Sequence, residues 1–354
     1  MDVTARPRRD VVTPPRLRTG DEVALLSLSG PLAARCPRRL ARAERELGRR
    51  GLIPRTDPTA LLDTGSTAGP AEVRAAHLTA AILDPAVRAV VSTVGGVGTR
   101  DLLPHLDPAA LAGSPTSVVG YSDTTSLLLW LYHRLGWTTY YGPAVLPQFG
   151  EHGGTADFTW RSFWEQLSGP GGGGVLPSTD DIVVETLFWD TQDDRPRAVG
   201  KAIRAVWSPG LATGPLVAAN IATLADDLRA GLHAGIGWDG HVVCLEESDS
   251  ASETDLRDAV EVLADSGLLD GAAALLVGRF AQDHRHEWPP GLGRRLLEPL
   301  ARRVSGPVVA DCEFGHTDPV LTLPIGAVAE VSAPVPGRGR PEFSLVSSRS
   351  RRSG

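Results

Sequence analysis

Cysteine, lysine and long apolar runs are scarce in this sequence, and each scarcity excludes a class of protein. The three cysteines, Cys36, Cys244 and Cys312, are an odd number at unrelated spacings, which fits neither a disulfide framework nor a zinc knuckle. No apolar run reaches the roughly 18 to 20 residues that span a bilayer. The Arg- and Pro-rich N-terminus also lacks the apolar segment of a secretory signal. These absences predict a cytoplasmic protein that makes no membrane contact.

Positive charge is limited as well. Lys201 is the one lysine, and the formal net charge of -7 argues against a general nucleic-acid binder, which is usually basic. Hydrophobic residues make up 42% and charged residues 22% of the chain, as in ordinary globular proteins. A chain of 354 residues is long for one hydrophobic core, so we expect two domains.

Motifs for cofactors and metals are missing. The glycine cluster Gly95 to Gly98 has neither the G-x-x-x-x-G-K-[ST] phosphate loop nor the G-x-G-x-x-G dinucleotide fingerprint. It suits either a plain tight turn or a backbone N–H that approaches an oxyanion. His284 and His286 alternate as they would on one face of a strand, but a metal site needs three or four convergent ligands. We therefore expect no metal and no cofactor.

Strand and helix patterns alternate through the first part of the chain. The predicted strands are 23–27, 89–93 and 117–119, and the predicted helices are 40–50 and 71–83. This alternation indicates a parallel α/β sheet, whose ligands lie beyond the carboxyl ends of the strands. The glycine turn at 95–98 and the turn after residue 119 both lie at such ends, so they can meet in space.

A glycine-rich run at 169–174 is the clearest linker signal and separates a second unit. In that unit the predicted strands are 199–207, 242–245, 272–277 and 307–310, and the predicted helices are 219–232 and 253–266. Residues 1–16 and 347–354 are polar and are predicted to be disordered. No internal repeat is present.

The stretch from Ser117 to Trp130, S-V-V-G-Y-S-D-T-T-S-L-L-L-W, combines a strand end, a sharp turn and a helix start. Gly120 permits the turn, and Asp123 is a residue type that begins helices. Ser122 would then lie at the tip, beside unpaired backbone N–H groups. This is the geometry of a nucleophile elbow, although the second glycine of G-x-S-x-G is missing. An ordinary N-cap serine explains the same residues.

Two more polar residues follow predicted strands. Glu246 ends the hydrophobic run V-V-C-L-E-E, and His316 lies in the turn F-G-H-T-D-P. Taken singly, a solvated strand end and a structural histidine explain them. A nucleophilic serine, however, needs a base within hydrogen-bond reach and an acid that orients the base. Ser122, His316 and Glu246 together fit that requirement.

Seven segments then occur in one order over about residues 17 to 335: G-D-E-V-A-L-L-S-L-S-G-P (20–31), S-T-V-G-G-V-G-T (92–99), G-Y-S-D-T-T (120–125), T-Y-Y-G-P (139–143), C-L-E-E (244–247), G-R-F (278–280) and F-G-H-T (314–317). In this order they resemble the LD-carboxypeptidase family of serine peptidases. That family includes murein tetrapeptide carboxypeptidases and microcin C self-immunity peptidases.

The resemblance implies an α/β fold with two domains. A Rossmann-like parallel α/β domain at 17–168 would carry the nucleophile, and a β-rich α/β domain at 199–346 would carry the acid and the base. Residues 169–198 would form a glycine-rich linker and substrate-shaping loop. The family is metal-independent and commonly dimeric, which implies a homodimer.

Site residues also follow from the resemblance. It assigns Ser122 as nucleophile, Glu246 as orienting acid and His316 as base. It places the oxyanion hole on the backbone N–H groups of Gly96 and Asp123. Candidate substrate-binding residues are Gly95 and Asn220.

Departures from the family pattern bear on the substrate. The S-T-x-G-G form at 92–96 is closer to the immunity-peptidase branch than to the R-G-G-Y-G of murein-type enzymes, and Ala218-Ala219-Asn220 replaces the family's G-G-N. A peptidyl or aminoacyl nucleotide is therefore the favoured substrate, and a murein tetrapeptide is the alternative. The aromatic-rich stretch 137–164 suits either stacking on a nucleobase or packing. A non-catalytic protein that sequesters a peptide or nucleotide is the rival from another class.

Overall fold

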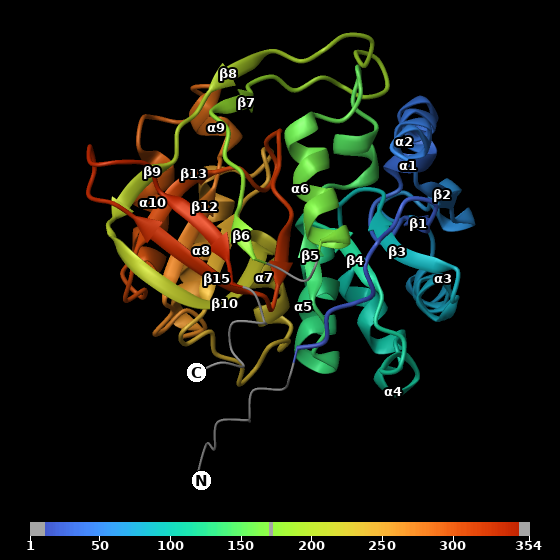
Figure 1. Ribbon diagram of the computed structural model, residues 1–354, viewed down its shortest axis with the longest axis horizontal. Coiled ribbons are helices and arrows are strands. Elements are labelled where there is room, and N and C mark those ends of the chain that lie inside the picture. Colours follow the sequence, from blue (N-terminus) through green and yellow to red (C-terminus); the bar gives the residue numbers. More distant parts are fainter. Residues whose placement is uncertain (1–10, 170–172, 347–354) are drawn as a thin grey trace.

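Two lobes make up the molecule in the computed structural model, which describes residues 11–169 and 173–346 (Figure 1). Most of the predicted terminal disorder falls on residues 1–10 and 347–354, which lie outside the described residues. Residues 11–16 correct that prediction. Val12 forms a β-bridge with Trp137, and its N–H donates to the carbonyl of Gly136 at 2.8 Å.

The N-terminal lobe is built on a six-stranded sheet of order β14-β5-β4-β3-β1-β2. Neighbouring strands are parallel, except that β14 is antiparallel to β5. The strands are β1 (Glu22–Leu26), β2 (Ile53–Thr56), β3 (Val87–Ser92), β4 (Ser117–Gly120), β5 (Thr139–Tyr141) and β14 (Leu323–Ile325).

Helices cover both faces of this sheet. Ala24 and Leu26 of β1 pack in a core with α3 and α5, whereas Val23 and Leu25 pack with α2 and α6. Burial on both faces is typical of a parallel sheet and confirms the predicted α/β class. The helices are α1 (Leu32–Arg35), α2 (Pro37–Arg49), α3 (Ala71–Leu83), α4 (Pro108–Leu111), α5 (Thr125–Leu135) and α6 (Asp157–Ser168), with 3-10 turns η1 (Pro58–Leu61), η2 (Arg100–His105) and η3 (Ser122–Thr124) and the π-turn η4 (Val145–Phe149).

The C-terminal lobe has an eight-stranded sheet of order β6-β16-β15-β10-β11-β12-β13-β9. Its central strands β10 to β13 are parallel, and the outer strands are antiparallel to their neighbours. The strands are β6 (Gly174–Val175), β9 (Ala205–Ser208), β10 (Gly210–Asn220), β11 (Val242–Glu246), β12 (Ala274–Gly278), β13 (Val308–Cys312), β15 (Val328–Ala333) and β16 (Glu342–Leu345), and a separate hairpin pairs β7 (Asp181–Val183) with β8 (Val199–Lys201).

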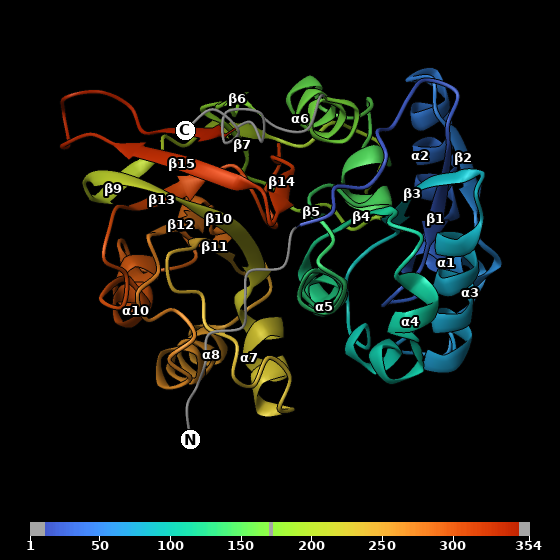
Figure 2. The same cartoon turned by 60° about the horizontal axis from the view of Figure 1, so that its bottom comes forward.

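Three helices of the C-terminal lobe lie together on one face of its sheet (Figure 2). They are α7 (Ile221–Arg229), α8 (Glu253–Asp265) and α10 (Leu292–Ala301), and the short α9 (Ala281–His284) lies apart. Ser252 and Asp255 form a capping box that explains why α8 begins where the sequence predicts. No helix in the described ranges is long and apolar enough to cross a bilayer.

The chain crosses between the lobes more often than the predicted boundaries allow. Strand β14, inside the predicted C-terminal domain, pairs with β5 at the edge of the N-terminal sheet. Strands β6 and β7, inside the predicted linker, pair with β16 and β8. Strands β14 and β6 each pair with the outer strand of a sheet, which offers free backbone groups, whereas β7 and β8 pair with each other.

The aromatic-rich stretch packs internally. Trp137, Tyr140, Phe149 and Phe163 are buried. Trp160 stacks on Trp164, with their ring centroids 5.6 Å apart. Of the two interpretations of this stretch, packing is the one that these positions support.

Candidate active site

Ser122 lies at the tip of the turn between β4 and α5, where the sequence places it. Its φ of 62° is strained for a residue other than glycine, and such strain is concentrated at functional sites. A Cβ at Gly120 would lie 2.9 Å from the Cγ2 of Thr124, so the turn needs glycine there. The N-cap interpretation is wrong. Thr124 occupies the N-cap of α5, and the Ser122 hydroxyl contacts His316 instead.

Ser122, His316 and Glu246 form one hydrogen-bonded chain that joins the two lobes. The Nε2 atom of His316 is 3.1 Å from the Oγ of Ser122, and its Nδ1 atom is 2.7 Å from the Oε2 of Glu246. Glu246 ends β11 with 0% of its surface exposed. Gly278 makes room for it, since a Cβ at that glycine would lie 2.7 Å from the Cβ of Glu246. In this geometry the acid can orient the base, and the base can accept the hydroxyl proton.

The surroundings of His316 favour its protonated form. Burial lowers the pKa of the imidazole, but the adjacent Glu246 carboxylate raises it, with further contributions from Asp249 and Glu247, so that the pKa is about 9. The ring of Tyr121 packs edge-on against the imidazole, with the centroids 4.9 Å apart. The imidazole is therefore a stronger base than an ordinary histidine.

Tyr141 contacts both Ser122 and Glu246. No role was predicted for this tyrosine from the sequence. Its hydroxyl donates to the Oε1 of Glu246 at 2.5 Å and accepts from the backbone N–H of Ser122 at 3.2 Å. Burial and the Glu246 carboxylate raise the pKa of Tyr141 well above its ordinary value, so the hydroxyl stays a donor. The T-Y-Y-G-P motif contains this residue, but its contacts depend on the fold.

Asn220 and Glu247 lie beside the acid. The Nδ2 of Asn220 donates to the Oε1 of Glu246 at 3.2 Å and to the Oε1 of Glu247 at 3.0 Å, while its Oδ1 caps α7 by accepting from the N–H of Thr223. No amide hydrogen is left for a substrate, which favours a role in holding the acid over the predicted substrate-binding role. Burial raises the pKa of Glu247, whose Oε2 accepts from the N–H of Ala222 at 2.9 Å.

The glycine turn meets the serine turn, as their positions at neighbouring strand ends predict. A Cβ on Gly95 would lie 2.8 Å from the Oγ of Ser122. Gly96 has a φ of 133°, which favours glycine, and the N–H of Gly30 donates to the carbonyl of Gly95 at 3.2 Å. Within the described residues, the N–H groups of Gly96 and Asp123 donate no hydrogen bond to the protein. Both are therefore available to an anion.

The carboxylate of Asp123 ties two loops to the serine turn. Its Oδ2 accepts from the hydroxyl of Ser29 at 2.5 Å and from the N–H of Thr99 at 2.8 Å. Burial raises the pKa of Asp123, and these donors oppose that effect. Ser29 precedes Gly30 and Thr99 follows the glycine cluster, so one carboxylate sets the position of both loops. From the sequence, only the backbone N–H of Asp123 was predicted to have a role, as a donor of the oxyanion hole.

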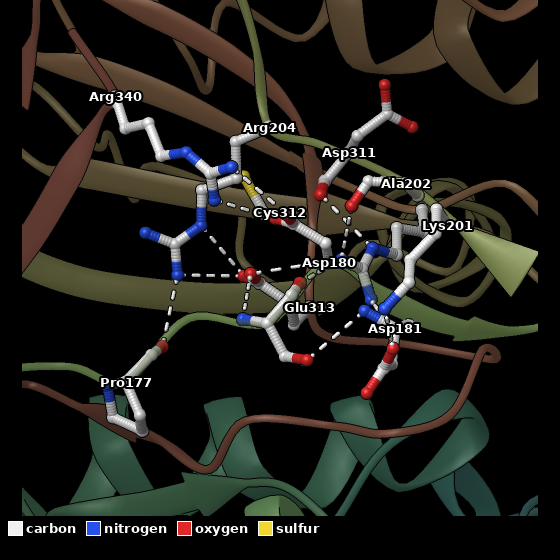
Figure 3. Close-up of polar contacts among 12 residues, drawn as sticks. Pro177, Asp180, Asp181, Lys201, Ala202, Arg204, Asp311, Cys312, Glu313 and Arg340 are labelled. Carbon is white, nitrogen blue, oxygen red and sulfur yellow. Dashed lines mark hydrogen bonds and ion pairs between the residues drawn. The ribbon is translucent and has the colours of Figure 1, made fainter.

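A buried ion cluster holds the strand that leads to His316 (Figure 3). Glu313, which is 1% exposed, pairs with Arg204 at 2.8 Å and accepts from the N–H of Thr179 at 3.0 Å. Arg279 of the G-R-F motif donates to the carbonyl of Thr179 at 2.6 Å and to carbonyls in both arms of the β7–β8 hairpin. The cluster therefore fastens this hairpin to the end of β13.

The segment between β7 and β8, within the predicted substrate-shaping loop, is held to both lobes by arginines. Arg39 of α2 pairs with Asp193 at 2.9 Å and also with Glu151. Arg197 pairs with Glu151 at 2.9 Å and with Asp318, which follows the His316 turn. Glu151, Arg197 and Asp318 line a pocket of about 520 Å³ between the lobes.

One of the two histidines considered as a metal site has another partner. His284 ends the short helix α9, so the pair does not lie on a strand, and its Nε2 is 2.9 Å from the Oδ1 of Asp311. Across residues 11–169 and 173–346, no group of three or more His, Cys, Asp or Glu side chains is placed to hold a metal ion. The three cysteines are buried and unpaired.

Two family models match this chain. Residues 23–142 match the LD-carboxypeptidase N-terminal domain, and residues 213–331 match the LD-carboxypeptidase C-terminal domain. The chain belongs to the LD-carboxypeptidase family. It is therefore a serine-type carboxypeptidase, and the two matched regions contain Ser122 in the first and Glu246 with His316 in the second.

Individual relatives cover nearly the whole chain. The microcin C7 self-immunity protein MccF of Escherichia coli is 29% identical over 88% of this chain and 90% of its own length. A carboxypeptidase homologue of Streptomyces coelicolor is 32% identical over 92% of this chain and 94% of its own. The solved structure of MccF in its wild-type apo state has a TM-score of 0.84 at 25% identity, covering 95% of this chain and 98% of that one. The two-lobed fold and the resemblance to the immunity branch are confirmed.

Proposed function

We propose that Ser122, His316 and Glu246 are the catalytic triad of this carboxypeptidase. The observation that carries the proposal is the hydrogen-bonded chain with distances of 3.1 Å and 2.7 Å. The Nε2 of His316 takes the hydroxyl proton as the Oγ of Ser122 attacks the carbonyl carbon of the scissile amide. That proton passes to the leaving amine, the C–N bond breaks, and the acyl group stays on Oγ. Water then attacks the ester with His316 again as base, which releases the acid and restores Ser122.

The oxyanion of the tetrahedral intermediate would be held by the backbone N–H groups of Asp123 and Gly96. Their lack of protein acceptors and the contact between Gly95 and Ser122 support this assignment. Removing one such donor typically costs about 2.7 to 4 kcal/mol of transition-state stabilisation. Because Gly95 has no side chain, a substrate can also approach its backbone closely.

The proposed substrate is a peptidyl or aminoacyl nucleotide, cleaved as protection against a nucleotide antibiotic. The S-T-x-G-G form at residues 92–96 supports it. So does the similarity to MccF, whose structure in complex with aspartyl sulfamoyl adenosine has a TM-score of 0.84 at 25% identity and covers 95% of this chain and 98% of that one. Stacking by the aromatics of the 137–164 stretch does not support it, because most of these side chains are buried or pack on one another.

A murein tetrapeptide, cleaved during cell-wall recycling, is the second candidate. The supporting observation is the relative named "Probable murein peptide carboxypeptidase" of Bacillus subtilis, which is 25% identical over 90% of this chain and 91% of its own. The chemistry of the triad would be the same, and the segments that shape the cleft would decide between the two substrates.

In the decisive experiment, purified protein is incubated separately with an aminoacyl nucleotide and with a murein tetrapeptide, and the products are identified by mass spectrometry. We expect the aminoacyl nucleotide to have the higher kcat/KM; the opposite order supports the murein alternative, and binding without turnover supports the sequestering rival. Ser122→Ala should abolish turnover and labelling by a fluorophosphonate probe. The matched control is Ser126→Ala, because the hydroxyl of Ser126 donates to Asp227 at 2.9 Å. Undiminished turnover by Ser122→Ala would overturn the triad.

We also propose that the chain forms a homodimer, as the family resemblance implies. Size-exclusion chromatography with light scattering measures this directly, and a mass equal to one chain at micromolar concentration would contradict it.

A further inference from the structure

We infer that Tyr141 is a positioning residue, which aligns the two lobes so that Ser122 of one lobe meets His316 of the other. The inference rests on the proposed triad. It adds a residue from the N-terminal lobe that contacts both Ser122 and Glu246. Tyr141 is 1% exposed, so its contacts are made inside the protein.

The place of Tyr141 in the sheet couples it to both halves of the site. In β5 it pairs with Gly120 of β4, the strand that leads into the Ser122 turn. On its other side it pairs with Leu323 of β14, the strand that follows the His316 turn and crosses into the N-terminal sheet. The backbone of one residue therefore lies between the segment that carries the nucleophile and the segment that carries the base.

The hydroxyl of Tyr141 makes the same connection through side chains. It accepts from the backbone N–H of Ser122 at 3.2 Å and donates to the Oε1 of Glu246 at 2.5 Å. The Oε2 of Glu246 lies 2.7 Å from the Nδ1 of His316. Ser122 and His316 are thus joined twice, once by the direct contact between Oγ and Nε2 and once through Tyr141 and Glu246.

Loss of this hydroxyl would leave one buried carboxylate and one part-buried N–H short of a partner. Glu246, which is 0% exposed, would keep only His316 and Asn220 among its side-chain contacts in the described structure. The N–H of Ser122, held at a strained φ of 62°, would lose its acceptor. Hydrogen bonds to charged buried groups are among the stronger ones in proteins, so removing this one should lower kcat/KM about 10-fold to 100-fold.

The same change should move the pH dependence. A carboxylate with one donor fewer attracts the neighbouring imidazolium more strongly, which raises the pKa of His316 further. The acid limb of the kcat/KM profile should therefore move to higher pH in Tyr141→Phe. A residue that merely fills space would change stability without moving this limb.

The chain offers a matched control in Tyr140, the neighbour of Tyr141 in β5. Both residues are buried, but they belong to the two different cores, on opposite faces of the sheet. We expect Tyr140→Phe to keep the kcat and the pH profile of the unsubstituted enzyme. Tyr141→Phe should lose kcat with KM changed by less than about threefold, because the perturbed groups act on the reaction step rather than on ground-state binding.

Equal kcat and equal acid limbs in Tyr141→Phe and Tyr140→Phe, with both variants folded by circular dichroism, would overturn the inference. If Tyr141→Phe does not fold, incorporation of 3-fluorotyrosine at position 141 keeps the hydroxyl and makes it a stronger donor, which should move the limb to lower pH. An unmoved limb with that replacement would also overturn the inference. Failure of the triad itself would show separately, as turnover that survives in Ser122→Ala.

Discussion

Replacing Gly95 with alanine adds one methyl group where the glycine turn touches Ser122. The new Cβ would lie 2.7 Å from the Cβ and 2.8 Å from the Oγ of Ser122, whereas ordinary contact begins at 3.4 Å. Gly95 is not among the glycines with a positive φ, so alanine is compatible with the backbone and the strain falls on the serine. Ser122 must move by several tenths of an ångström. Since a misplacement of about 1 Å can cost 10²-fold in rate, we expect kcat/KM to fall on the order of 30-fold to 100-fold.

The assay combines turnover of the better substrate, the rate of fluorophosphonate labelling and the melting temperature. Gly113→Ala is the matched control, because a Cβ at Gly113 meets nothing within 4 Å. We expect both variants to stay folded and only Gly95→Ala to be labelled slowly. Labelling of Gly95→Ala at the unsubstituted rate would refute the close approach of the two turns.

Three further predictions concern protonation, stability and loop position. Because only neutral imidazole accepts the proton and the pKa of His316 is about 9, kcat/KM should fall roughly tenfold per pH unit below that value, and a flat profile between about pH 6 and pH 9 contradicts this. Glu313→Gln leaves Arg204 buried without its counter-charge and should lower the free energy of unfolding in urea by about 3 to 5 kcal/mol. The exposed Glu298→Gln should change that free energy by less than about 1 kcal/mol, and equal effects would reject the argument. Ser29→Ala removes a donor from the carboxylate beside the serine turn and should lower kcat about tenfold; an unchanged kcat would show that this contact does not position the turn.

Local patterns predicted several elements closely. Helix α3 spans Ala71–Leu83, the predicted range, because its apolar residues repeat with helical spacing. The Ser122 turn was predicted from Gly120 and the helix-starting residues that follow, which depend on neighbours in sequence alone.

Other boundaries depended on partners far away in the sequence. Ala219 and Asn220 were predicted to begin a helix, yet they end β10 because Leu245 and Glu246 of β11 pair with them in register. Strand β14 was not predicted, since its three residues are strand only by pairing with β5. The sequence likewise allowed two interpretations of the aromatic stretch, and only the folded structure supports packing.

The sequence by itself determined the α/β class, the order of the strand-end turns and, through that order, the family and three of the polar residues in the site. These properties lie in short segments, where residue type and spacing act on adjacent backbone. Only the tertiary structure decided that Ser122 and His316 meet, that Tyr141 and Asn220 hold Glu246, and that Asp123 ties two loops together. Asp123 and Ser29 are 94 positions apart and Ser122 and His316 are 194 apart, and sheet register rather than local pattern brings such residues together.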